Sequence, residues 1–111
     1  MEALAKGDVV LFPFPYTDLS TRKLRPCLVL SSEMREDVLL CQITSKKTRP
    51  DSFAVELGKT ETLNGSLQVD SFIRANMLFT AQKRQVLSKV CSVSGEKYSQ
   101  VVEKITRLVS K

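Results

Sequence analysis

The stretch Leu24–Ser31 constrains the fold more than any other part of the chain. Within it, Cys27–Leu30 is uninterruptedly apolar and is bounded by a proline and by serines. Such a short apolar run predicts a strand buried on both faces, and therefore a central strand. Pro26 lacks an N–H and favours an extended conformation at the residue before it. We expect Arg25 to be held at the head of a core strand, although alone it would suit an ordinary exposed arginine.

A second apolar run ends in two hydroxyl side chains. Val38–Ile43 predicts another strand, and Thr44 and Ser45 end it, while residues 32–37 form a polar connection. If these strands pair as an antiparallel hairpin, the start of the first lies beside the end of the second. The sequence therefore predicts that Arg25 and Thr44 are neighbours at one rim of the sheet. A local role of Thr44 in satisfying backbone groups remains the alternative.

The flanking segments predict a mainly β fold. Val9–Phe12 indicates a further buried strand, and Pro13 and Pro15 should end its ladder, which leaves residues 13–23 as a loop. Polar residues turn the chain at Gly58–Gly65. Later extended elements are expected at Ser52–Leu57, Ser66–Ile73 and Val86–Val93. Residues 77–79 continue the second of these or bend away from it. One short helical turn is expected at Ala81–Gln85.

One helix closes the chain. Ser94 can cap it, and its apolar residues follow the spacing of an amphipathic helix. They are Tyr98, Val101, Val102, Ile105, Leu108 and Val109. Five or six short strands followed by a helix indicate an α+β fold, mainly β, in the form of a small half-open barrel with the helix packed on it.

Length and composition place few further limits on the chain. Its 111 residues suit a single domain, 1–111, with one compact core. No apolar run reaches the ~20 residues of a membrane span, and the N-terminus shows no secretory signal, so we expect no membrane association and a cytoplasmic protein. Cys27, Cys41 and Cys91 lie in apolar runs, and the chain has no histidine. Reduced core thiols fit this pattern better than disulfides or a metal site.

Positive charge gathers next to the predicted strand ends. The chain has 17 basic and 12 acidic residues and a formal charge of +5, which favours a polyanionic partner. Two basic segments beside one sheet edge predict a phosphate-binding groove, although loop lysines that only aid solubility give the same pattern. The segments contain Arg22, Lys23 and Arg25, and Lys46, Lys47 and Arg49.

The expected loop over residues 13–23 adds aromatic side chains to this edge. Phe14 and Tyr16 offer faces on which nucleic-acid bases can stack. Phe14 can equally fold back into the core. Because loops of this length in small domains are often functional, we consider the segment a candidate binding element.

Taken in order, short motifs along nearly the whole chain resemble the MazF/PemK toxins. They are Gly7–Val10, Phe12–Phe14, Leu24–Pro26 before Leu28–Ser31, Ile43–Ser45, and Ser66 with Arg74. No single motif is specific, but the set occurs at compatible spacing. The resemblance implies an SH3-like barrel, a homodimer, ribosome-independent cleavage of single-stranded RNA at short sequences, and neutralisation by a cognate antitoxin.

The resemblance also implies roles for individual residues. The family's catalytic arginine falls on Arg25 and its catalytic threonine on Thr44. The segment 14–23 matches a loop that shapes the RNA groove and that the antitoxin occludes. Separately from the resemblance, Asp18 is a candidate base because it is the only acid between Asp8 and Glu33. The expected RNA-binding residues are Phe14, Tyr16, Asp18, Arg22, Lys23, Ser45, Lys46 and Lys47.

These residue types suit RNA cleavage. RNA can be cut by its own 2′-hydroxyl, so an enzyme needs to position that attack and stabilise charge, and we expect no metal or other cofactor. Arg25 would act as an electrostatic clamp, since a guanidinium stays protonated, and Thr44 would hold a phosphate oxygen or orient the attacking hydroxyl. The expected products carry 2′,3′-cyclic phosphate and 5′-hydroxyl ends.

Other functions stay open at this point. A non-catalytic nucleic-acid-binding module would show the same charge and the same basic segments. A toxin with the same barrel could poison a protein target, as the gyrase poisons do, and would make the Arg25–Thr44 pair incidental. A toxin that has lost its activity is a further alternative.

Overall fold

The computed structural model describes residues 3–15, 22–45 and 52–110. Its helices and strands follow one another along the chain as β1 (Asp8–Pro15), β2 (Arg22–Val29), β3 (Asp37–Ser45), β4 (Ala54–Leu57), β5 (Ser71–Gln82), the 3-10 helix η1 (Lys83–Gln85), β6 (Ser88–Ser92) and α1 (Gly95–Val109).

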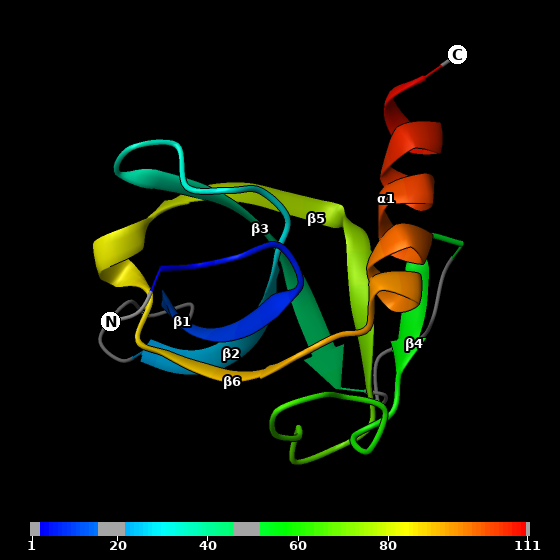
Figure 1. Ribbon diagram of the computed structural model, residues 1–111, viewed down its shortest axis with the longest axis horizontal. Helices are drawn as coiled ribbons and strands as arrows, with labels where there is room; N and C mark the ends of the chain where they lie inside the picture. The colour runs from blue at the N-terminus through cyan, green and yellow to red at the C-terminus, as the bar shows by residue number, and fades with distance from the viewer. Residues whose placement is uncertain (1–2, 16–21, 46–51, 111) are drawn as a thin grey trace.

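The strands form one curled, antiparallel sheet with the helix on one side, which confirms the predicted fold class (Figure 1). In the described residues the strand order is β4-β5-β3-β2-β1-β6. The connection of residues 58–70 runs from β4 to β5, and its Leu63 forms an isolated bridge with Ser92 of β6. The two ends of the sheet therefore approach each other through this connection, as in a half-open barrel.

The predicted central strand is central, and both of its faces are buried. β2 lies between β1 and β3, and Cys27, Leu28 and Val29 have no solvent exposure. Leu28 belongs to the larger hydrophobic core, on the side of α1. Cys27 and Val29 belong to a second core with Val10. A strand with apolar residues at successive positions can serve two cores because its side chains alternate between the faces.

The expectation that Pro13 and Pro15 end the first strand was wrong. β1 continues to Pro15, and Pro13 pairs with Leu24 of β2. β6 pairs with β1 only as far as Leu11, whose carbonyl accepts a hydrogen bond from Leu87. Along a strand, the backbone N–H and C=O groups of every second residue point toward the same neighbouring strand. The backbone positions of Pro13 and Pro15 therefore face the same side as that of Leu11, where β1 has no partner beyond Leu11 in the described residues. The missing N–H groups of the two prolines cost no ladder hydrogen bond there.

The expected boundaries around β5 also need correction. The strand begins at Ser71, so residues 66–70 belong to the preceding connection rather than to an extended element. It then continues without a break through 77–79 to Gln82, and the helical turn is confined to Lys83–Gln85. The register of β5 against β3 shifts between Cys41 and Ile43. This irregularity interrupts the simple alternation along β5, which the sequence pattern could not show.

The C-terminal helix begins where the capping residue predicts. The Ser94 side chain accepts a hydrogen bond from the Lys97 backbone N–H, and the helix lies along β5 and β4 (Figure 1). Val101 is fully buried in the larger core, and Tyr98 donates a 2.6 Å hydrogen bond to the Leu30 carbonyl. Three of the apolar positions instead face solvent, namely Val102, Leu108 and Val109. No helix in the described ranges is long and apolar enough to cross a membrane.

Candidate active site

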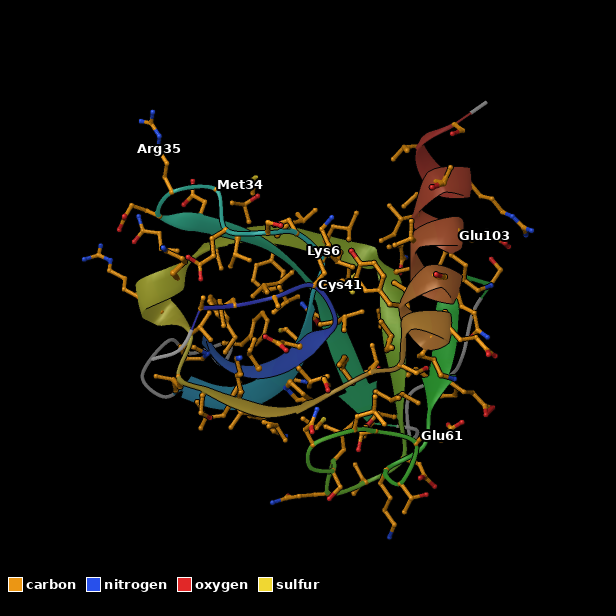
Figure 2. All side chains as sticks on the ribbon, viewed as in Figure 1. Lys6, Met34, Arg35, Cys41, Glu61 and Glu103 are labelled. Carbon is orange, nitrogen blue, oxygen red and sulfur yellow. The ribbon has the colours of Figure 1, made fainter. Side chains whose placement is uncertain are left out.

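One cavity of about 530 Å³ opens at the end of the sheet opposite the β2–β3 turn. That turn, with Met34 and Arg35, points away from the molecule (Figure 2). We call the side of the cavity formed by Lys23–Pro26 of β2 and Ile43–Ser45 of β3 the strand wall. The C-terminal end of β3 lies beside the 58–70 connection (Figure 1). The volume lies within the range of about 300–1,000 Å³ typical of ligand sites.

The strand wall contains both residues proposed as catalytic from the sequence. Arg25 and Thr44 each line the cavity. The β2–β3 ladder pairs Leu28 with Cys41 and ends at the pair Cys27 and Gln42. Arg25 and Thr44 each lie two residues beyond that last pair, at the end of the hairpin that lines the cavity. The hairpin thus places a cation and a hydroxyl on one wall of the cavity, while direct contact between the two side chains stays a prediction.

The Thr44 hydroxyl is buried without a hydrogen-bond partner among the described residues. Although its Oγ1 atom is buried, the residue as a whole is only half-buried and lines the cavity. A buried polar atom without a partner costs about 1–3 kcal/mol. The local backbone role that was the alternative for this side chain is therefore not realised in this conformation. Rotation about χ1 moves Oγ1 to another staggered position, and the residue lines the cavity.

A second side of the cavity, the loop wall, is formed by Ser66–Val69 and ends at Ser71 of β5, which pairs with Ser45 of the strand wall. Leu11 and Val90 complete the lining. The loop wall has no regular secondary structure before Ser71, yet it is anchored: Leu67 is buried in the larger core. Its exposed side chains are polar or small apart from Val69, which is 53% exposed.

Hydrogen bonds to β6 hold the connection that carries the loop wall. Leu63 and Ser92 exchange backbone hydrogen bonds, both of 2.8 Å. Thr62 donates a 2.6 Å hydrogen bond to the Gly65 carbonyl. Gly65 has φ +134° and lies so close to β6 that an added Cβ would overlap the Val90 carbonyl oxygen. Only glycine fits such a position without strain.

The three thiols lie behind these walls, buried and unpaired with one another. Burial raises the pKa of Cys27 to about 12, with a further rise from Cys41 and an opposing effect of the Arg25 charge. Burial raises the pKa of Cys41 to about 12 as well. Burial also raises the pKa of Cys91, against the effect of a hydrogen bond with Thr62. The described residues contain no group of three or more thiols and carboxylates placed to hold a metal ion.

The expected RNA-binding residues are only partly accounted for. Lys23 and Ser45 line the cavity and are exposed. Phe14 does not line it: its ring packs edge-to-face on Phe12 and Phe79, with centroids 5.2 and 5.5 Å away, against the second core. Arg22 lies at the start of β2, and its side chain is outside the described residues, as are Tyr16, Asp18, Lys46, Lys47 and Arg49.

A family model provides the decisive comparison. The PemK-like, MazF-like toxins of type II toxin–antitoxin systems match residues 5–109. This chain belongs to that family. No curated protein sequence matches the chain significantly.

Solved structures with the same fold include toxins of this family. An endoribonuclease in complex with its cognate antitoxin from a mycobacterial species superposes with a TM-score of 0.74 at 16% identity, covering 95% of this chain and 93% of that chain. A MazE–MazF complex from Deinococcus radiodurans gives 0.74 at 19% identity, covering 97% of each chain. MazF from the same organism gives 0.73 at 20% identity, covering 98% of each chain. At these identities the likeness shows the shared fold.

Reasoning from the sequence missed most of the loop wall of this PemK/MazF-family toxin. Ser66 was noted only as part of the family pattern, and Gln68, Val69 and Ser71 were not noted as site residues. No local pattern marks them, because their place at the cavity depends on the contact between Gly65 and β6. The one available signal was Gly65 itself, since an isolated glycine before a strand can mark a close backbone approach.

Proposed function

We propose that this chain is the toxin of a type II toxin–antitoxin pair and acts as a metal-independent endoribonuclease. Its substrate is single-stranded RNA, in the cell mRNA, cut at short sequences so that translation and growth stop. The observation that carries the proposal is the placement of Arg25 and Thr44 on one wall of a cavity of about 530 Å³. Family membership and the endoribonuclease named among the similar structures support the same activity.

The strand wall suits an attack by the RNA's own 2′-hydroxyl. In that reaction the 2′-oxygen forms a bond to phosphorus while the bond from phosphorus to the 5′-oxygen breaks. Arg25 stabilises the charge on the phosphoryl oxygens through its fork of donors. It does not act as a base because a guanidinium stays protonated. The described residues of the lining include no carboxylate, and Asp18 lies outside the described residues. In the balanced step the 2′-hydroxyl gives up its proton to water, and the leaving 5′-oxygen takes up a proton from water.

Thr44 would assist by hydrogen bonding. When its hydroxyl turns into the cavity, it can donate to a phosphoryl oxygen opposite Arg25 and so gain the partner that it lacks in the free protein. The binding of the transition state then gives a hydrogen-bond partner to a polar group that has none in the free protein, which favours the transition state. Lys23, at the rim, adds a positive charge for the RNA backbone. The products carry 2′,3′-cyclic phosphate and 5′-hydroxyl ends.

The proposal includes protein partners. A cognate antitoxin is expected because the similar structures include complexes with antitoxins. A homodimer is expected from the family resemblance, and the exposed Val102, Leu108 and Val109 of α1 are compatible with a protein interface. The toxin acts in the cytoplasm, where mRNA is available.

The deciding experiment is RNA cleavage by the purified protein in excess EDTA, with the ends mapped. We expect cuts at a recurring short sequence with cyclic phosphate ends. Arg25→Ala should lower the single-turnover rate at least about 100-fold, as does loss of a donor to developing charge. Arg84→Ala removes an equal charge at the exposed η1 segment and should leave the rate unchanged.

Each other outcome points to a different function. RNA that is bound but never cut, with binding that weakens as salt rises, would support the non-catalytic binding module. Full activity in Arg25→Ala would refute the assigned catalytic role. If RNA is neither cut nor bound, a protein target or an inactive toxin remains.

A further inference from the structure

The loop wall presents one side-chain amide to the cavity that Arg25 and Thr44 also line. Gln68 lines the cavity and is exposed to solvent. Its carboxamide combines an acceptor with two donors in one plane, whereas the Ser66 hydroxyl offers a single donor and the Ser71 hydroxyl already donates to the Val69 carbonyl. Its neighbour Val69 adds an exposed apolar surface. This combination fits a planar group that has a polar edge and an apolar face.

The backbone that carries Gln68 is fixed from both sides. Leu67, immediately before it, is only 8% exposed and belongs to the larger core. Ser71 donates a 3.0 Å hydrogen bond to the Val69 carbonyl, and the Asp70 carboxylate accepts one of 2.9 Å from the Lys59 backbone N–H. On such a backbone the main chain is already ordered, so binding has to order only the Gln68 side chain.

The two walls divide the recognition of RNA between them. If the phosphate to be cut lies against Arg25 and Thr44, the adjoining nucleotide extends across the cavity toward the loop wall. In single-stranded RNA the bases are unstacked, and proteins read them through hydrogen bonds to their edges and contacts with their faces. Gln68 and Val69 supply these contacts from the loop wall.

We infer that Gln68 hydrogen-bonds the edge of the nucleobase next to the cleaved phosphate and thereby selects which sequences are cut. The inference rests on the proposed endoribonuclease function and adds a specificity-determining residue to it. Gln68 does not take part in the chemistry, so its loss changes the choice of sequence rather than the ability to cut.

The test is to cleave an RNA library with randomised sequence, using the wild-type protein and three variants, and to compare the base preferences around the cut. In Gln68→Ala the preference at one position beside the cut should fall about tenfold, a typical discrimination for an amide that pairs with a base. Gln68→Glu keeps the length and the acceptor but loses the donors, so the preferred base at that position should change. Thr60→Ala, an exposed polar residue of the same connection outside the cavity, should leave the preferences unchanged.

The outcomes separate this inference from the proposed function. Unchanged preferences in both Gln68 variants, with RNA still cut, would refute the role of Gln68 and leave the nuclease assignment intact. An equal loss of rate at every sequence would also refute it, because that pattern indicates a structural role. If the wild-type protein cuts no RNA, the function and the inference fail together.

Discussion

The strand wall of the cavity belongs to a continuous sheet, whereas the loop wall is held by separate contacts to β6. Arg25 and Thr44 lie at the end of a hairpin that is paired from Cys27 to Val29 and whose paired residues in β2 are fully buried. The loop wall depends on the Leu63–Ser92 bridge and on the close approach of Gly65 to Val90. Paired strands therefore position the proposed catalytic residues Arg25 and Thr44, whereas an irregular segment carries Gln68, the residue proposed to select the RNA sequence.

This division has a physical basis. A cation and a hydroxyl that stabilise developing charge must keep their relative position, and neighbouring strands of a central sheet provide the most rigid frame in a small domain. An irregular connection tolerates changes of side chain and length far better. We therefore expect the two walls to respond differently to substitution, and three experiments test that difference.

The largest effect should come from Gly65→Ala, in the connection that carries the loop wall. The alanine would have to adopt φ +134°, and its Cβ would overlap the Val90 carbonyl oxygen and lie 3.3 Å from the Cys91 Cβ. Backbone strain of this kind costs about 1–3 kcal/mol before the overlap is relieved. We expect the free energy of unfolding, measured with urea, to fall by at least about 2 kcal/mol, or the connection to detach from β6.

Gly95→Ala is the matched control. A Cβ at Gly95 meets no atom within 4 Å, and the residue is the first of α1. This substitution should leave the stability unchanged or raise it by up to about 1 kcal/mol, since alanine restricts the unfolded chain. Equal effects of the two substitutions would show that the loop wall is not seated on β6 as described.

The next effect separates activity from stability in the strand wall. Thr44→Val replaces the unpaired hydroxyl by a methyl group of the same shape. The free energy of unfolding should stay unchanged or rise by about 1 kcal/mol, because a buried group without a partner is removed. The single-turnover rate of RNA cleavage should nevertheless fall about 100-fold if Thr44 donates to the transition state.

A threonine-to-valine exchange in the connection that carries the loop wall should lower the stability and leave the cleavage rate nearly unchanged. Thr62→Val removes the 2.6 Å hydrogen bond to the Gly65 carbonyl, so the free energy of unfolding should fall by about 1 kcal/mol. The rate of the chemical step should change little. A loss of rate in Thr62→Val as large as in Thr44→Val would contradict the division between the walls.

The contrast between the strand wall and the loop wall also explains which part of the site could be predicted from the sequence. The strand wall was predictable because two apolar runs and a short polar connection define a hairpin, and the hairpin sets Arg25 and Thr44 at the same end. The continuation of β1 through Pro13 was not predicted. A proline costs a ladder hydrogen bond only where its missing N–H would face a neighbouring strand, and the arrangement of the whole sheet determines on which side that strand lies. The loop wall was missed because its seating depends on contacts with residues of β6 that are distant in the sequence.

The smallest effect concerns the thiols behind the two walls. Alkylation requires the thiolate, and burial raises the pKa of Cys27 and Cys41 to about 12 and also raises that of Cys91. All three should react slowly with iodoacetamide at pH 8. Cys91 lies under the loop wall, against Gly65 and Thr62, so a local opening of the 58–70 connection exposes it. Cys27 and Cys41 lie in the centre of the sheet and need global unfolding.

Peptide mapping by mass spectrometry after timed alkylation distinguishes these routes. Cys91 should react first, at a rate that depends little on low concentrations of urea, because local openings expose little surface. The rates at Cys27 and Cys41 should rise with urea in step with global unfolding. Thr62→Val should speed the reaction of Cys91 alone. If all three thiols react together at every urea concentration, the loop wall opens only when the sheet does, and the two walls form a single cooperative unit.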